Sequence, residues 1–187
     1  MKKAIVVFIG LTFLASVSLA YAGQKSERLA GIEQSLKDDV PRILCVDESF
    51  ATAGQPKETA FAKLATNGFR SVLNLRTDAE GIDLARERET AEKAGLRYIN
   101  VPVSTQSLGE ETVAAFIKAV KDKSNHPMLI HCGTANRVGA MMMIFRVLDQ
   151  GWTEEKALEE ATAIGLTSPN LKKFAQDYIA THKKGSK

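Results

Sequence analysis

The chain has 187 residues, of which 44% are hydrophobic and 25% are charged. This length and apolar content suit a single domain with its own hydrophobic core. The 25 basic and 22 acidic residues give a net charge of +3, which excludes the strongly basic surface that nucleic-acid-binding domains present.

Residues 1–22 have the pattern of a secretory signal peptide. Lys2 and Lys3 precede an apolar run over residues 4–19, and Ala20-Tyr21-Ala22 supplies the small residues of a cleavage site. An uncleaved membrane anchor is the alternative, but the apolar run is short for a span of ~20 residues. We therefore expect a periplasmic or secreted protein that has no stable membrane anchor after cleavage.

From residue 42 onward, predicted strands and helices alternate. The domain is expected over 42–182, after an N-terminal extension at 23–41 with a helical pattern and before a basic tail at 183–187. Alternation of this kind predicts an α/β fold with a mainly parallel sheet of four to five strands flanked by helices. We predict strands over 43–46, 69–75, 97–103 and 128–131, and helices over 57–66, 82–94, 110–121, 138–150, 153–164 and 169–181.

Ligands of parallel sheets bind beyond the carboxyl ends of the strands. The residues that follow each predicted strand are therefore candidates for a site. They are Thr52, Gly54 and Gln55 after the first strand, Arg76, Thr77, Asp78 and Glu80 after the second, Ser104, Thr105 and Gln106 after the third, and Cys132 after the fourth.

The chain contains two cysteines, Cys45 and Cys132. In an exported protein two cysteines can form a disulfide. The alternative is a buried structural Cys45, which lies in an apolar strand-like run, and a reactive Cys132. No cysteine and histidine cluster has metal-ligand spacing, so we expect neither a metal nor a cofactor.

The strongest motif follows the fourth predicted strand and precedes a predicted helix. Cys132 would lie at a helix N-terminus, where unpaired N–H groups and the positive end of the helix dipole stabilise a thiolate and a bound oxyanion. The planar guanidinium of Arg137 suits two hydrogen bonds to phosphate or sulfate. Taken singly, the two side chains could be an ordinary buried thiol and helix-start arginine, but their combination favours an oxyanion site. The motif reads His131-Cys132-Gly133-Thr134-Ala135-Asn136-Arg137.

This loop resembles the active-site loop of cysteine-based phosphatases, which has His-Cys, a run of small residues and then Arg. Those enzymes normally place five residues between the cysteine and the arginine, whereas four stand here. Four is also the spacing in rhodanese-type sulfurtransferases. Val138 occupies the place of the hydroxyl residue that usually follows the phosphatase arginine. The loop alone leaves both chemistries open.

Further segments extend the resemblance over roughly residues 42–178. Together they are similar to a bacterial family of phosphatase-like proteins, related to the phosphatase-like domain fused to beta-lactamase-like hydrolases. The family keeps the four-residue spacing. Thr134-Ala135 stands where a Ser-Gly pair is expected, so the loop lacks the flexibility of glycine. The matching segments are Ala53-Gly54-Gln55-Pro56, residues 68–76, residues 94–98 and 101–103, and the loop with the residues up to 140.

The resemblance implies a dual-specificity-phosphatase-like fold. It also implies hydrolysis of phosphomonoesters through a phosphocysteine, with Cys132 as the nucleophile and Arg137 as a phosphate ligand. The N–H groups of the loop would hold the phosphoryl oxygens, where charge develops in the transition state. His131 would orient the cysteine, or be a strand-end histidine that bonds to nearby backbone. The substrate would be a phosphorylated small molecule or a phosphoprotein. The loop residues proposed to bind it are Gly133, Thr134, Ala135 and Asn136.

A general acid is needed to protonate the leaving oxygen. The loop after the third predicted strand has no carboxylate, so Asp78 is the candidate by position, with a solvated cap as its alternative. Arg76 is a candidate second anion ligand or a partner of Glu80. Gln55 would orient water or the substrate, or cap a helix. Two other functions stay open: a sulfurtransferase with a persulfide on Cys132, and an anion-binding domain without turnover.

Overall fold

The computed structural model describes residues 26–104 and 108–183. The predicted signal peptide at 1–22 and residues 184–187 of the predicted basic tail lie outside them. In the described parts of the chain, no helix has the length and apolar content to cross a bilayer. A first helix, α1 (Glu27–Leu36), lies within the predicted N-terminal extension.

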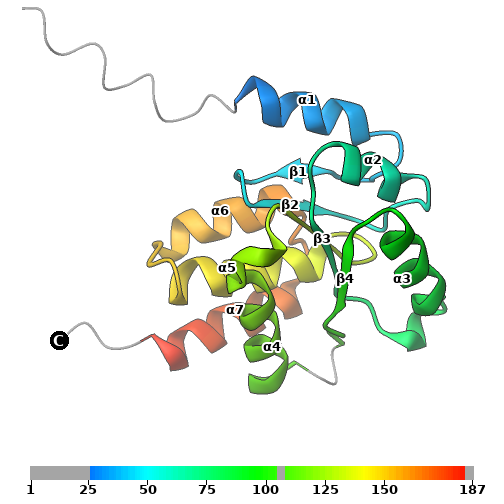
Figure 1. The fold of residues 1–187 in the computed structure, drawn as a ribbon. Coiled ribbons are helices and arrows are strands. Elements are labelled where there is room, and N and C mark those ends of the chain that lie inside the picture. The colour runs from blue at the N-terminus through cyan, green and yellow to red at the C-terminus, as the bar shows by residue number, and fades with distance from the viewer. Residues whose placement is uncertain (1–25, 105–107, 184–187) are drawn as a thin grey trace, which may run out of the picture.

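A five-stranded sheet runs through the middle of the molecule in the order β1-β2-β5-β3-β4 (Figure 1). The strands are β1 (Leu44–Cys45), β2 (Phe50–Ala53), β3 (Ser71–Asn74), β4 (Arg97–Asn100) and β5 (Met128–His131). All neighbours pair in parallel except β1, which runs antiparallel to β2 at one edge. The predicted α/β fold with a mainly parallel sheet is confirmed.

Helices cover both faces of this sheet (Figure 1). Besides α1, they are α2 (Ala60–Thr66), α3 (Leu84–Lys93), α4 (Glu110–Lys121), α5 (Asn136–Leu148), α6 (Glu154–Ile164) and α7 (Pro169–His182). One apolar cluster joins α1, α2 and α3 to one face of the sheet, and a larger one joins the other four helices to the opposite face. The molecule is therefore a three-layer α/β structure.

The helix α5 is enclosed by the larger cluster. Every residue from Val138 to Val147 is buried. A Cβ added at Gly139 would lie 2.7 Å from the carbonyl oxygen of Ala161 and 2.9 Å from Cβ of Leu166, so glycine permits the close approach of α6. This contact holds the first turns of α5, which directly follow the cysteine loop.

The strand β2 corrects one expectation from the sequence. Thr52 was treated as a residue beyond the end of the first strand, but it lies inside β2 and is fully buried. All four residues of β2 are buried, so the strand has no alternation of apolar and polar side chains. Its composition, Phe-Ala-Thr-Ala, also has few strong strand formers. The pattern was therefore too weak to predict a strand.

The two cysteines lie on opposite faces of the sheet. Cys45 is in register with Ala51 and, through it, with Leu129, and packs in the cluster of α1, α2 and α3. Cys132 follows Leu129 by three positions and packs in the other cluster. Because successive side chains of a strand point to opposite faces, the two thiols diverge. This placement favours the buried structural Cys45 over a disulfide.

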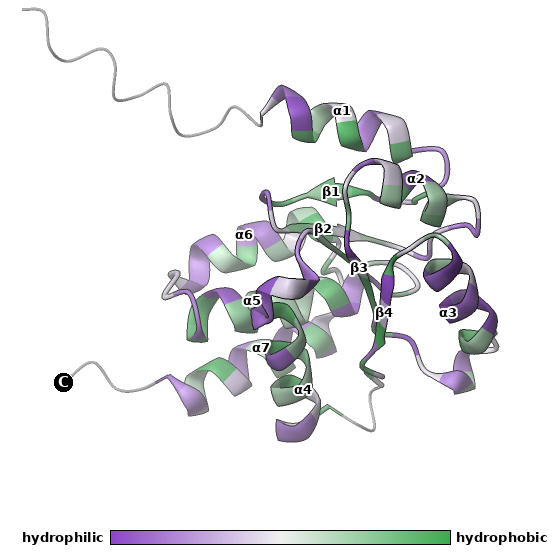
Figure 2. Cartoon of the chain, viewed as in Figure 1, coloured by the Kyte–Doolittle hydropathy of each residue, from purple (hydrophilic) through white to green (hydrophobic). Residues whose placement is uncertain are grey.

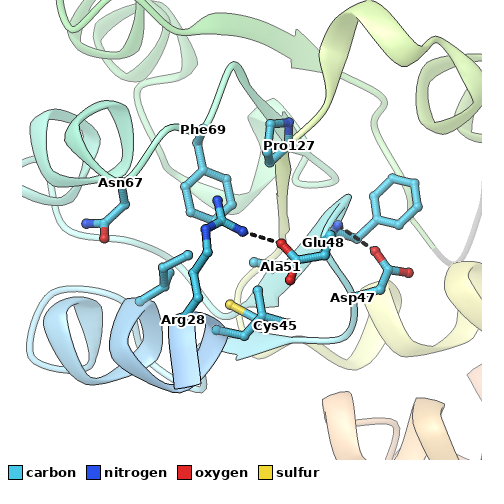
Figure 3. A pocket seen from close by; sticks show the side chains of 11 residues that line it. Arg28, Cys45, Asp47, Glu48, Ala51, Asn67, Phe69 and Pro127 are labelled. Atoms are coloured by element: carbon cyan, nitrogen blue, oxygen red, sulfur yellow. Dashed lines mark hydrogen bonds and ion pairs between the residues drawn. The ribbon is translucent and has the colours of Figure 1, made fainter. Parts of the chain in front are cut away.

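Figure 3 shows a small hollow beside Cys45, next to an ion pair between Arg28 and Glu48. Its volume of about 10 Å³ is room for about one water molecule. Pro127 lines it and immediately precedes β5, whereas Cys132 immediately follows β5. The hollow is therefore at the amino end of the parallel strands, away from the cysteine loop.

Candidate active site

The loop that joins β5 to α5 lies at the carboxyl end of the central strand. Gly54 and Thr134 form an isolated bridge, and the backbone N–H of Gln55 donates to the carbonyl oxygen of Gly133 at 3.2 Å. A Cβ added at Gly54 would lie 3.1 Å from that same oxygen, so glycine allows the segment after β2 to run beside the loop. Cys132 is thereby held between a strand and the N-terminus of a helix.

Ala135 is the last residue of the loop before α5. Its backbone is left-handed, with a φ of 67°. A side chain in this region costs roughly 1–2 kcal/mol, whereas glycine adopts it freely. Ala135 takes the place of the glycine in the expected Ser-Gly pair, although its left-handed backbone is a conformation that glycine adopts more easily. The loop keeps its turn, but at an energetic cost.

The guanidinium of Arg137 faces the start of the loop. A Cβ added at Gly133 would lie 3.8 Å from Nη2 of Arg137. Burial alone would lower the pKa of Arg137, but its hydrogen bond with Glu80 and its interaction with Cys132 raise it above the ordinary value. Cys132 is only 1% exposed. Its side chain is therefore almost completely enclosed by the loop and the core.

Glu80 holds that guanidinium with both carboxylate oxygens. Its Oε1 lies 2.6 Å from Nη1 of Arg137, and its Oε2 lies 2.7 Å from Nη2. Nη1 also donates to the carbonyl oxygen of Val103 at 2.8 Å. The hydrogen bond from Arg137, with others from Thr77 and Arg76, lowers the pKa of Glu80 to about 2 although partial burial opposes this. Glu80 is therefore ionised at neutral pH and fixes the direction of the guanidinium.

Arg76 and Gln55 connect this pair to the rest of the loop. Arg76 donates from Nε to Glu80 at 2.9 Å and from Nη1 to Oε1 of Gln55 at 2.9 Å. The other end of the same amide, Nε2 of Gln55, donates to Glu87 at 2.6 Å. Both side chains were expected to bind substrate. Their polar atoms are instead engaged with protein groups, which makes positioning of the loop their better supported role.

His131 lies beneath the loop, fully buried, with Nε2 3.1 Å from Oε1 of Glu87. The approach is close, but neither ring nitrogen has a well-directed hydrogen bond to another described residue. Tyr98 and Asn74 also donate to Glu87, at 3.1 and 2.8 Å. Burial alone would raise the pKa of Glu87, but His131 above all, with Gln55 and Tyr98, lowers it below the ordinary value. A buried carboxylate thus supports the histidine that precedes the cysteine.

Nothing in the sequence indicated Glu87, whereas Glu80 was indicated as a strand-end candidate and a possible partner of Arg76. Glu87 lies on α3, which Figure 2 shows to be largely hydrophilic, and such a helix indicates a solvent-exposed surface. Yet Glu87 is only 8% exposed. The partners of Glu80 and Glu87 on the loop are far away in sequence, so no local pattern indicates either contact.

Asn136 begins α5 and ties the loop to the connection between α6 and α7. Its Oδ1 accepts from the backbone N–H groups of Thr167 and Ser168, both at 2.8 Å, and its Nδ2 donates to Oγ1 of Thr167 at 2.9 Å. The side chain expected to bind substrate is therefore engaged in holding the loop. Thr134, in contrast, is exposed at the rim.

A pocket of about 520 Å³ opens beside the guanidinium of Arg137. Asp78, the expected general acid, is exposed and does not line it, although Thr77 and Ala79 on either side do. In the described parts of the chain, no group of three histidine, cysteine or carboxylate side chains is placed to hold a metal ion. The pocket is lined by Thr77, Ala79, Glu80, Val103, Ser104, Asn136, Arg137 and Leu171.

Comparison with known proteins identifies the family of the chain. The model of the family described as "DSP-PTPase phosphatase fused to NAD+ Kinase" matches residues 32–179. A beta-lactamase hydrolase-like protein of Xylella fastidiosa (strain 9a5c) is 34% identical over 113 residues, which are 58% of this chain and 26% of that protein. The chain therefore spans about a quarter of the length of that relative.

Solved structures agree with the fold. A DUF442 protein of Shewanella putrefaciens CN-32 has a TM-score of 0.67 and 23% identity, covering 80% of this chain and 98% of that one. TpbA of P. aeruginosa, solved as a cysteine-to-serine variant with phosphotyrosine, has a TM-score of 0.59 and 20% identity, covering 74% and 82%. With the family model matching most of its length, the chain belongs to the family of DSP-PTPase phosphatases.

Proposed function

We propose that the protein is a cysteine-dependent phosphatase that hydrolyses phosphomonoesters. One observation carries the proposal: Glu80 directs the guanidinium of Arg137 toward Cys132, in the loop that leads into α5. Arg76 and Arg137 share the single carboxylate of Glu80, so the cluster keeps a net positive charge that suits a phosphoryl group. Membership of a phosphatase family supports this chemistry over sulfur transfer.

The reaction would proceed in two displacements. The thiolate of Cys132 attacks phosphorus and forms the P–S bond as the bond to the leaving oxygen breaks. The guanidinium of Arg137 and the N–H groups of the loop hold the three other phosphoryl oxygens through the transition state. Water then attacks phosphorus, the P–S bond breaks, and phosphate and the thiolate are released.

The leaving oxygen must receive a proton in the first step and the water must lose one in the second. Glu80 cannot supply it, because its pKa of about 2 keeps it ionised at neutral pH. We therefore retain Asp78 as the proposed general acid, which requires its exposed side chain to turn toward the pocket. Asp78→Asn should lower the turnover of an alkyl phosphate about 10²-fold and that of an aryl phosphate with a good leaving group much less. Asp38→Asn, at another exposed aspartate, is the control.

The nucleophile is tested with the purified protein and 4-nitrophenyl phosphate. We expect hydrolysis that Cys132→Ser abolishes and Cys45→Ala preserves, with a phosphocysteine trapped by acid quenching and found by mass spectrometry. Full activity of Cys132→Ser would refute the mechanism. Cyanide-dependent release of thiocyanate from thiosulfate, without phosphatase activity, would establish a sulfurtransferase instead. Phosphate binding with neither activity would establish an anion-binding domain.

The proposed substrate is a phosphorylated small molecule or a phosphoprotein. Phosphotyrosine bound to TpbA supports an aryl phosphate among the candidates. We also propose that the protein acts in the periplasm or outside the cell, on the strength of the signal-peptide pattern at 1–22. Fractionation of cells that express the tagged full chain tests this, and recovery from the cytosol with an intact N-terminus would refute it.

A further inference from the structure

Arg42 places a second guanidinium beside the cysteine loop, on the side away from the partners of Arg137. A Cβ added at Gly165 would lie 3.0 Å from Nε of Arg42 and 3.2 Å from Cβ of Ala135. The guanidinium of Arg42 and Cβ of Ala135, the left-handed residue of the loop, therefore both lie close to Gly165. Gly165, with no side chain, leaves room for both.

Topology sets the two arginines on opposite flanks of the loop. Arg42 comes from the segment just before β1, at one edge of the sheet. Arg137 instead donates to the carbonyl oxygens of Leu75 and Val103, which follow β3 and β4 on the other side of β5. The two arginines therefore come to the loop from opposite sides of β5.

Arg42 differs from the other arginines near the core because its side chain has no partner among the residues that the structure describes. Arg76, Arg137 and Arg146 each form ion pairs with carboxylates. Across residues 26–104 and 108–183, no hydrogen bond or ion pair reaches the side chain of Arg42, which is exposed. Its charge is therefore available to a ligand.

The backbone of Arg42 is strained, and neighbouring hydrogen bonds hold it in this conformation. Its φ of 57° is in the left-handed region, which is uncommon for a residue with a side chain. On either side, the carbonyl oxygen of Pro41 accepts from the N–H of Gly54 at 2.8 Å, and the N–H of Ile43 donates to Val40 at 3.2 Å. Strain maintained by surrounding bonds is often found where a side chain serves a function.

We propose that Arg42 binds a second anionic group of the substrate, a phosphate or a carboxylate, while the loop binds the phosphoryl group that reacts. This inference rests on the proposed phosphatase function and deepens it. It makes the preferred substrate a phosphomonoester with another negative charge close to the scissile group. A guanidinium is suited to this because it can donate two parallel hydrogen bonds to such a group.

The test measures anion affinity by calorimetry with Cys132→Ser as the parent protein, so that no probe is hydrolysed during the titration. Inorganic phosphate probes the loop alone, pyrophosphate adds a second phosphate, and 2-phosphoglycolate adds a carboxylate. We expect the two doubly anionic probes to bind more tightly than phosphate. Arg42→Gln should weaken them about tenfold and change phosphate affinity less than twofold, and Arg42→Lys should weaken them less. The probe that responds more identifies the second group.

The control is Arg70→Gln, which removes the same charge from an exposed arginine before β3, at the opposite end of the strands. It should leave all three affinities unchanged, and thermal unfolding should show that both variants fold. If Arg42→Gln weakens all three probes equally, or none, the inference is wrong while the proposed function stands. If the unmodified protein binds no phosphate and hydrolyses no phosphomonoester, the proposed function itself fails.

Discussion

Glu80 contacts Arg137 through two parallel hydrogen bonds of 2.6 and 2.7 Å, across a sequence separation of 57 residues. Bidentate pairs of this kind fix the plane of a guanidinium as well as its position. The plane matters because the same guanidinium must meet two phosphoryl oxygens at a defined angle. Glu80 thus fixes the orientation of the guanidinium of Arg137, which is the group proposed to bind phosphate.

We expect Glu80→Gln to lower kcat/KM for 4-nitrophenyl phosphate about tenfold or more, because the guanidinium loses its fixed orientation. The variant should also be less stable at neutral pH by roughly 1–2 kcal/mol. Since the folded-state pKa of about 2 lies below the ordinary 4.5, this contribution is present above pH 4.5 and is lost as the pH falls toward 2. Urea unfolding across this range measures it.

The control for this pair is Glu159→Gln, at an exposed residue of α6. Its stability should follow that of the unmodified protein at every pH. A stability gap for Glu80→Gln that stays constant below pH 4.5 would contradict the ion pair with Arg137.

Gln55 is expected to be a positioning residue. Gln55→Leu removes the acceptor of Arg76 and a donor to Glu87, so that Arg76 and Glu87 each lose one hydrogen bond. We predict a loss of about 1–3 kcal/mol in unfolding free energy, and a fall in kcat that exceeds any rise in KM. Gln34→Leu, on the exposed face of α1, should change neither. A rise in KM with unchanged kcat would instead indicate that Gln55 touches the substrate.

Ala135→Gly should relieve the left-handed backbone at the end of the loop. We expect a gain of roughly 0.5–1 kcal/mol in unfolding free energy, in contrast to the usual cost of glycine. Ala114→Gly, at an exposed position in the middle of α4, should lose about 1 kcal/mol. Equal losses in the two variants would show that Ala135 is not strained. Thermal and urea unfolding of both variants decide the matter.

The reactivity of Cys132 is expected to be selective despite its low exposure. Iodoacetate is an anion that can enter the loop as phosphate would, so it should alkylate Cys132 faster than the neutral iodoacetamide does. Phosphate should slow the reaction by occupying the loop. Cys45, buried on the other face of the sheet, serves as the internal control and should stay unmodified in the folded protein. Peptide mapping reports both sites, and alkylation of Cys132 that phosphate does not slow would contradict the anion site.

The sequence predicted the parts of the site that follow from local order. β5 and α4 have the bounds expected from their apolar patterns, and the strand that runs into the cysteine loop is where the motif put it. The departure at Ala135 was also visible in the sequence, because an alanine stood where glycine was expected. Its φ of 67° shows the physical reason.

What the sequence could not predict depends on tertiary contacts. Glu80 is four residues from Arg76, so helix-like spacing indicates that pair, but nothing local connects it with Arg137. Glu87 is one of several charged residues on α3, and only the packing of that helix against β4 singles it out for burial. The backbone of Arg42 is left-handed, and this conformation sets the position of its side chain near the loop. No pattern in the sequence indicated it.

The enclosure of α5 has a consequence for how the anion site is lost. A loop on a surface helix can fray while the rest of a domain persists, but here the helix after the cysteine is the one that the core is built around. Backbone amides of α5 from Gly139 onward, which are hydrogen-bonded within the helix, should exchange with deuterium only when the whole domain opens. The site and the domain would then melt as one cooperative unit, with no partly unfolded state that keeps its core yet releases a bound anion.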